Sequence, residues 1–377
     1  MRQKKELGKR VVTKRSLRRR KSRLKAKLKT CRFCSWEVIE KARKKLDTVK
    51  LPKHRITRAT NFYSNKRVRF LVPKEVDYYK KSNYEILNTF LADIRDCALR
   101  AKRRVFLDFS ETKFISAAAM LSFLAEIDVI TKKSHYGSRS VSFNHPREHK
   151  MESVLKQVGF YDLLKKQKRE TKEYEDVTFW KYTSGVCSEP ILAKEMITDI
   201  KSELKKSASK KLYRGFVEAM SNSVEHAYAD DSEHCEEDST AKWWTFAGIR
   251  NAELVVVLCD KGVGIPQTLP RTQGPTKIQE MLNFLGVTKF EVKDSTFIQA
   301  ASSLSHTRTG QSYRGKGLTD MKSVIDSIGN GFMSIFSNSG RYIYKGSQGV
   351  VRELTMDYKH SVSGTIVEWT IPLKGDE

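Results

Sequence analysis

Three short segments carry residues whose types and spacing could bind and activate a phosphorylated ligand. In the first, positions 215–227, Glu218, Asn222 and His226 recur every four residues and therefore share one face of a predicted helix. The carboxylate of Glu218 could orient or deprotonate a nucleophile, and the amide oxygen of Asn222 could bind Mg²⁺, which prefers oxygen ligands. Taken alone, the same spacing also fits a solvated polar stripe on an amphipathic helix.

The second segment, positions 254–266, joins a buried strand to a glycine turn. Residues 254–259 (L-V-V-V-L-C) form a short apolar run rich in β-branched residues, which predicts the strand. Asp260 follows at its end and could accept a hydrogen bond from an exocyclic amine such as adenine N6. Gly262 and Gly264 would let the backbone turn sharply and approach a ligand closely. An ordinary Asx or glycine turn is the alternative.

The third segment is R-G-K-G-L at positions 314–318, which opens a predicted helix over residues 318–328. A glycine-rich loop at a helix N-terminus presents free N–H groups and the positive end of the helix dipole to phosphate. Lys316 would add a positive charge. The segment lacks the pattern of a Walker A loop, and a flexible basic loop is the alternative interpretation.

In this order the segments resemble the Bergerat-fold ATP-binding superfamily, also called GHKL, which includes DNA gyrase B, histidine kinases and anti-sigma-factor kinases. The resemblance covers about residues 185–373, and the domain that it implies is expected to span residues 185–377. The stretch S-G-T-I-V-E-W-T-I-P-L at positions 363–373 is similar to the family's final strand, which brings a Thr near the adenine. The fold implied is an α/β sandwich with a mixed sheet and helices on one face.

The resemblance also implies a role for each matching residue. Glu218 would be the general base or the water-orienting group, and Asn222 would bind Mg²⁺. Asp260 would read adenine N6, and Thr365 would support the adenine side. Gly262 and Gly264 would pass beneath the base, while Arg314, Gly315, Lys316 and Gly317 would hold the phosphates. His226 matches a His-Ala pair common in the family, for which a structural hydrogen bond is expected. The segment 266–314, with a helix at 278–285, corresponds to the lid over the nucleotide.

Residues 1–60 form a basic arm that accounts for most of the chain's net charge of +27. They hold 24 Lys and Arg against 4 Asp and Glu, and so dense a block of like charge cannot fold alone. We expect it to bind a polyanion such as DNA, RNA or an anionic surface, through contacts that weaken steeply with salt. A solubilising tail is the alternative.

Residues 66–166 alternate strand and helix, which predicts an α/β layer. The expected strands are 68–72, 105–109 and 141–143, and the expected helices are 84–99, one opening near Ser116, and one within 145–165 that stops at Gly159. This order resembles a STAS domain, the fold of anti-sigma-factor antagonists, which implies docking of a protein partner. The family's D-S-S-G, whose Ser accepts phosphate, reads Ser116-Ala117-Ala118-Ala119 here, so a phosphorylation switch is not expected.

The remaining segments give weaker signals. Residues 166–187 are charged and are expected to be a linker, residues 190–204 a helix, and the acidic residues 230–238 a loop. Cys31 and Cys34 form a C-x-x-C without further zinc ligands, so free thiols are expected. The absence of an apolar run of eighteen residues and of an apolar leader predicts a cytoplasmic protein that does not contact a membrane.

These observations predict a regulatory protein that binds ATP and Mg²⁺. Glu218 could activate water, as in an ATPase, or activate a Ser or Thr of a partner, as in an anti-sigma-factor-like kinase. ATP could also only lock a conformation in a nucleic-acid-binding protein. A histidine kinase is not expected, because no H-[ED]-x-x-[ST]-P phosphoacceptor helix is present. The resemblance also allows a homodimer.

Overall fold

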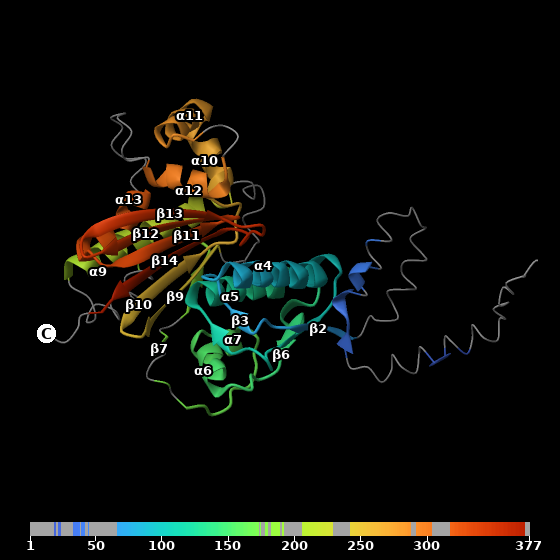
Figure 1. Cartoon of the computed structure of the whole chain (residues 1–377). Coiled ribbons are helices and arrows are strands. Elements are labelled where there is room, and N and C mark those ends of the chain that lie inside the picture. The colour runs from blue at the N-terminus through green and yellow to red at the C-terminus, as the bar shows by residue number, and fades with distance from the viewer. Residues whose placement is uncertain are drawn as a thin grey trace, which may run out of the picture. The chain divides into compact units, whose positions relative to one another are not determined.

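The computed structural model in Figure 1 contains two compact units, Met1–Arg69 and Phe70–Glu377. The residues that it describes are 19, 22–23, 33–37, 39–41, 44, 66–172, 174, 178–179, 182–188, 191, 206–228, 242–287, 292–303 and 317–373. In the smaller unit, β1 (Phe33–Cys34) pairs in parallel with Arg67 and Val68 of β2 (Arg67–Leu71). Most of the basic arm, the predicted helix at 190–204 and the acidic loop at 230–238 lie outside the described residues.

The first part of the larger unit, residues 70–166, is an α/β layer that we call the first subdomain. β4 (Val105–Asp108) pairs in parallel with β6 (Val141–Phe143), and β3 (Glu75–Val76) with β5 (Phe114–Ile115). Its helices are α4 (Lys81–Arg95, extended by a π-helical turn Asp96–Arg100), α5 (Ala117–Lys133), α6 (His149–Gln157) and α7 (Phe160–Leu163), with a 3₁₀ turn at Gly137–Arg139. These elements confirm the alternating order predicted from the sequence, and Gly159, with φ of +80°, separates α6 from α7.

The second subdomain, residues 178–373, is built on one large sheet. Its strands are β7 (Thr178–Phe179), β8 (Thr183–Gly185), β9 (Trp243–Arg250), β10 (Glu253–Cys259), β11 (Gly331–Ser337), β12 (Gly340–Ser347), β13 (Val350–Asp357) and β14 (Thr365–Pro372). The order is β13-β12-β11-β14-β10-β9-β7, and β8 also pairs with β9. The predicted mixed sheet is wrong for the described strands, whose pairings are all antiparallel. Tight hairpins join β9 to β10 and β11 through β13, and tight hairpins require antiparallel neighbours.

The predicted linker at 166–187 is also corrected, because its second half adds strands to the sheet. Thr178 lies opposite Ile249, and Thr183 lies opposite Thr245. The partner strand β9 has no counterpart among the elements expected from the sequence. It is the stretch W-W-T-F-A-G-I-R, whose aromatic and β-branched residues favour a strand.

Two long helices cover one face of the large sheet. α9 (Lys206–Glu225) and α13 (Gly317–Ile328) lie side by side there, and their apolar residues share a core with the sheet. Phe216 and Met220 of α9 pack in this core with Val324 of α13 and Trp369 of β14. The close packing depends on Gly215, since a Cβ there would lie 3.0 Å from the Met321 backbone.

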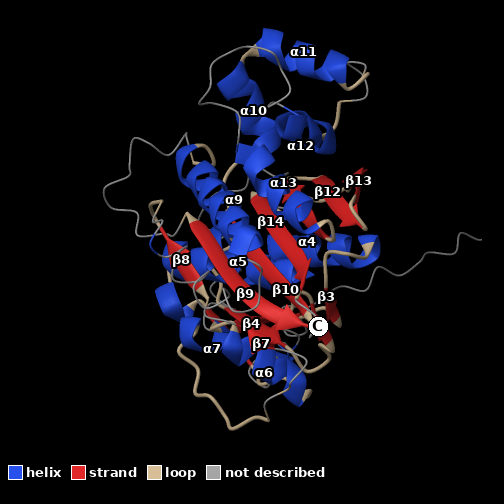
Figure 2. Cartoon of the chain, turned by 90° about the vertical axis from the view of Figure 1, so that its left-hand side faces the viewer, coloured by secondary structure: helices blue, strands red, loops and turns tan. Residues whose placement is uncertain are grey.

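Three further helices, α10 (Ile265–Gln273), α11 (Pro275–Phe284) and α12 (Asp294–Ser303), occupy the segment expected to be the lid. They gather beyond α13 in both Figure 1 and Figure 2. Only α11 was expected from the sequence, over nearly the same residues.

The opposite face of the large sheet is not open, because α5 of the first subdomain packs against β9, β10 and β14. The expectation of helices on one face is therefore incomplete. α5 is buried along almost its whole length, as expected for a helix packed on both sides. Trp244 on β9 donates its indole N–H to Asp128 of α5 at 2.9 Å, and Tyr84 of α4 stacks on Tyr358 with ring centroids 3.8 Å apart.

Candidate functional site

A cavity of about 640 Å³ lies between α9, α13, α10 and the ends of β10 and β14. The lining residues include Glu218, Asn222, Asp260, Gly264, Gly317 and Thr365, six of the positions selected from the sequence. These positions span nearly 150 residues of the chain, and the fold brings them together because α9 and α13 pack across the end of the strand that carries Asp260.

Glu218 and Asn222 face the cavity one turn apart on α9, beside the first residue of α13. A Cβ on Gly317 would lie 3.1 Å from Glu218 Oε2 and 3.4 Å from Asn222 Nδ2. Glycine therefore leaves room for both polar side chains at the N-terminus of α13. A helix N-terminus, a carboxylate and a carboxamide together suit an anionic ligand accompanied by a hard cation.

The environment of Glu218 raises its pKa above the ordinary value of a glutamate. Burial raises the pKa of Glu218, and the nearby carboxylate of Asp320 raises it further, while Arg214 acts in the opposite direction. Arg214 and Asp320 form an ion pair at 3.1 Å between α9 and α13. A carboxylate with a raised pKa is a stronger base, as general-base catalysis requires.

Asp260 lies at the floor of the cavity with 5% of its surface exposed. Its Oδ1 accepts the backbone N–H of Gly262 at 2.9 Å and of Thr365 at 3.2 Å. Ser223 is 3.5 Å from Oδ2, which is long for a hydroxyl donor. Burial raises the pKa of Asp260 to about 6, against the lowering effect of the two backbone hydrogen bonds. Oδ2 is therefore the oxygen with capacity to accept a hydrogen bond from a ligand.

The two glycines after Asp260 have different roles in the structure. A Cβ on Gly262 would collide with the carbonyl oxygen of Ala227, so this glycine lets the turn pack against the end of α9. Gly264 lines the cavity and has φ of +83°, a conformation that favours glycine. Both glycines were predicted to pass beneath a base, but only Gly264 lines the cavity.

Thr365 begins β14 and connects Asp260 to the wall of the cavity. Its backbone oxygen accepts the N–H of Asp260 at 2.8 Å, and its hydroxyl lies 3.0 Å from Ser337 Oγ. Ser337 Oγ in turn accepts the N–H of Ile265 at 2.8 Å. This chain of contacts fixes the start of α10, which forms one wall.

Three of the predicted phosphate-binding residues, Arg314, Gly315 and Lys316, lie outside the described residues. His226 lines the rim of the cavity and is exposed. Its backbone N–H donates to Asn222 O at 3.1 Å, which continues the hydrogen-bond pattern of α9; the structural hydrogen bond expected of its side chain stays a prediction.

Two residues of the site were not selected from the sequence. Ser223 contacts Asp260, and Asp320 lies beside Glu218. The signal for Asp320 is an acidic residue in the first turn of a predicted helix, a favoured position at the positive end of the dipole. Nothing in the local pattern distinguishes Ser223 from its neighbours.

The start of α5 is buried in the chain itself. Ser116, the hydroxyl nearest the family's phosphorylation position, is 0% exposed at the start of α5. Among the described cysteines, Cys34, Cys97, Cys187 and Cys259 form no disulfide, and Cys31 lies outside the described residues.

Within the described residues, no cluster of three or more His, Cys, Asp or Glu residues could hold a metal ion. A carboxamide such as Asn222 is a different type of ligand. None of the described helices is long and apolar enough to cross a membrane. No protein-family model matches the chain, and a search of curated proteins finds no match to it.

Proposed function

We propose that the second subdomain binds Mg-ATP in the manner of the GHKL superfamily and that the chain is an ATP-dependent regulatory protein. The observation that carries the proposal is the convergence of Glu218, Asn222, Asp260 and Thr365 on one cavity. These are the positions at which the resemblance requires a base, a metal ligand and an adenine reader. A solvated polar stripe on α9 would not place Glu218 and Asn222 opposite Asp260.

The cavity suits an adenine nucleotide at both ends. At the floor, Asp260 Oδ2 would accept the N6 amine, while Leu258, Ile335 and Val367 provide an apolar lining for a purine ring. At the other end, the N-terminus of α13 would face the phosphates. Mg²⁺ usually takes only one or two protein ligands beside phosphate oxygens and water, so Asn222 alone would suffice as its side-chain ligand.

Glu218 would act as the base. Its raised pKa and its place beside Gly317 support proton transfer from a nucleophile near the terminal phosphate. Of the two acceptors that the resemblance allows, water is favoured over a hydroxyl of this chain such as that of Ser116, because Ser116 is buried at the start of α5. A partner Ser or Thr is the alternative acceptor.

We further propose that the first subdomain is STAS-like, that it serves docking, and that the basic arm contacts nucleic acid or another polyanion. The element order of residues 70–166 supports the first assignment, and the charge of residues 1–60 supports the last.

Isothermal titration of the full chain with ATP and Mg²⁺ tests the nucleotide assignment. Asp260→Asn should weaken ATP binding by about 1.5–3 kcal/mol, because a charged acceptor is lost. Asp162→Asn, an exposed carboxylate on α7, is the matched control and should bind as the parent does. Equal affinities for the parent and Asp260→Asn would remove Asp260 from adenine recognition. GTP should bind more weakly than ATP, because guanine has a carbonyl oxygen at position 6, where adenine has the amine that would donate to Asp260.

Incubation with γ-labelled ATP, with and without DNA, RNA and cell lysate, then identifies the acceptor. Release of free phosphate indicates an ATPase, and labelled protein indicates a kinase. Binding without either product indicates that ATP only locks a conformation.

A further inference from the structure

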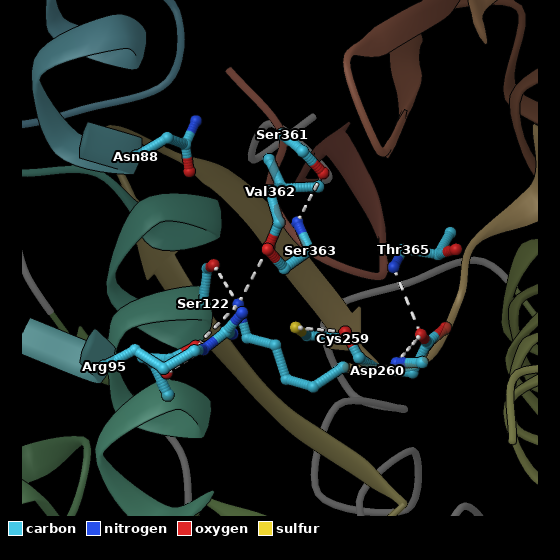
Figure 3. A network of polar contacts seen from close by, with 12 residues as sticks. Asn88, Arg95, Ser122, Cys259, Asp260, Ser361, Val362, Ser363 and Thr365 are labelled. Carbon is cyan, nitrogen blue, oxygen red and sulfur yellow. Dashed lines mark hydrogen bonds and ion pairs between the residues drawn. The ribbon is translucent and has the colours of Figure 1, made fainter. Parts of the chain in front are cut away.

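A buried lysine connects the candidate nucleotide cavity to the first subdomain. Lys261 follows Asp260 directly, and the two side chains serve opposite sides of the same turn. Asp260 lines the cavity, whereas the ammonium of Lys261 reaches α5 on the other face of the sheet. Figure 3 shows Asp260 and Thr365 on one side of this network and Ser122 and Arg95 on the other.

The ammonium group has two hydrogen-bond acceptors and one carboxylate around it. It donates to Ser122 Oγ at 2.8 Å and to the Val362 carbonyl at 3.1 Å. Glu126 Oε2 lies 4.0 Å away. Both side-chain groups belong to α5, so the first subdomain supplies the nearest negative charge and one of the two acceptors.

Glu126 is itself held in a fixed position. Arg95 of α4 donates through Nε to Glu126 Oε1 at 2.7 Å, and through Nη2 to the other oxygen. Ser122 Oγ also accepts the hydroxyl of Tyr78 at 3.0 Å. The network is therefore continuous from α4, through α5, to the residue beside Asp260.

Such a network is sensitive to the docking of α5. The Lys261 side chain is 4% exposed, and burial lowers its pKa while Glu126 opposes the change. A buried cation that loses its partner carries a penalty of several kcal/mol. Lys261 is thus stable in this position only while Ser122 and Glu126 are present, and it would move to solvent if α5 left the sheet.

A movement of Lys261 would disturb the residues that hold Asp260. The backbone N–H of Lys261 donates to the Tyr228 hydroxyl at 2.9 Å. The segment 362–365 contacts both side chains, since Val362 O binds Lys261 and the Thr365 N–H binds Asp260. A Cβ on Gly364 would collide with the Asp260 carbonyl, which shows how closely this segment packs on the turn.

We propose that docking of the first subdomain controls the affinity of the cavity for nucleotide, with Lys261 as the connecting residue. This rests on the proposed function and adds a regulatory role for α5. In the docked state Ser122 and Glu126 hold Lys261, and Asp260 is set for the adenine. Release of α5 frees the turn and weakens binding. By thermodynamic linkage, nucleotide must stabilise docking to the same extent.

Substitutions on α5 test the coupling without altering any cavity residue. Glu126→Gln and the smaller change Ser122→Ala should each weaken ATP binding, measured by isothermal titration of the full chain, by about five- to fiftyfold. Glu75→Gln removes an exposed ion pair with Lys80 in the same subdomain and is the matched control. Thermal melts establish that each variant is folded. If Glu126→Gln does not fold, Ser122→Ala alone tests the coupling.

Hydrogen exchange supplies the reciprocal measurement. Saturating Mg-ATP should slow exchange in residues 117–133 of the parent chain, and Lys261→Met should abolish that protection. If the parent binds ATP while Ser122→Ala and Glu126→Gln bind equally well and ATP leaves exchange in α5 unchanged, the coupling is refuted and the nucleotide assignment stands. If the parent does not bind ATP, both proposals fall.

Discussion

At the scale of single residues, the candidate site depends on carboxyl groups whose burial is only partly compensated. Oδ1 of Asp260 accepts two backbone N–H groups, whereas the Ser223 hydroxyl lies 3.5 Å from Oδ2, which is long for a hydrogen bond. Oδ2 can therefore accept a further hydrogen bond, and buried carboxylate oxygens normally have such a partner. A ligand that donates one hydrogen bond there would complete the set.

The raised pKa of Asp260 predicts how ATP affinity changes with pH. Because burial raises the pKa of this carboxyl to about 6, it is mostly ionised at pH 7.5 and mostly protonated at pH 5. The two backbone N–H groups occupy Oδ1, so protonation falls on Oδ2 and removes the acceptor. Affinity should fall about tenfold between pH 7.5 and 5.

Titration calorimetry across this range measures the effect, and Asp260→Asn corrects for the titration of the nucleotide itself. The variant should show a flatter profile than the parent. Parallel profiles for the two proteins would assign the pH dependence to the phosphates and not to Asp260.

Glu218→Gln should separate binding from chemistry. The amide keeps the size of the side chain but cannot accept a proton, so turnover should fall by about 10²–10⁴-fold. ATP affinity should change little, because Gly317 leaves room for either group. Glu253→Gln, an exposed carboxylate on β10 that does not line the cavity, is the control for phosphate release from labelled ATP. Turnover at the parent's rate in Glu218→Gln would exclude Glu218 as the base.

At the scale of elements, the sequence predicts those whose pattern is local. The β-branched run at 254–259 and the helix at 318–328 lie within a residue of β10 and α13. The same holds for β14, where eight residues from Thr365 to Pro372 match the expected strand. Each of these elements is bounded by glycine, proline or a charged turn that ends it.

Two of the missed strands, β7 and β8, depend on a partner far away in the chain. They are only two and three residues long and become strands by pairing with β9, whose partner residues lie 58 to 71 positions later. The docking of α5 on the sheet also depends on distant residues, since Asp128 accepts a hydrogen bond from Trp244, 116 residues later. The local pattern identified α5 as apolar but did not indicate the second sheet that covers it.

The contact between β14 and the first subdomain predicts a dependence of stability on pH. Burial raises the pKa of Glu368 to about 7, although the Tyr79 hydroxyl donates to it. The folded state therefore holds the proton more tightly than the unfolded state. The protonated Glu368 carboxyl therefore contributes roughly 3 kcal/mol to the free energy of unfolding below pH 4.5, and this contribution is lost as the pH rises to about 7.

Glu368→Gln should remove this loss, so the variant should gain stability relative to the parent at pH 8 and not at pH 4.5. Urea unfolding at the two pH values measures the difference. Glu253→Gln, an exposed carboxylate on neighbouring β10, should leave the parent's profile unchanged. A stability difference between variant and parent that is the same at both pH values would show that folding does not raise the pKa of Glu368.

At the scale of the whole molecule, charge and chemistry are separated along the chain. The excess of Lys and Arg is concentrated in residues 1–60, whereas the candidate nucleotide site lies beyond residue 200. The first subdomain lies between them in sequence and contacts the rear of the large sheet. This order fits a protein in which docking, and not the arm, acts on the nucleotide site.

Deletion of residues 1–30 tests that separation. Nucleic-acid binding by the arm would release counterions from each phosphate contacted, so it should weaken steeply as salt rises. The truncated chain should lose this salt-sensitive binding to mixed-sequence DNA and RNA in a fluorescence anisotropy series, because 15 of the arm's basic residues are removed. Its ATP affinity should equal that of the full chain, since no cavity residue is altered. Retention of nucleic-acid binding would move the polyanion site elsewhere, and a loss of ATP affinity would connect the arm to the nucleotide site after all.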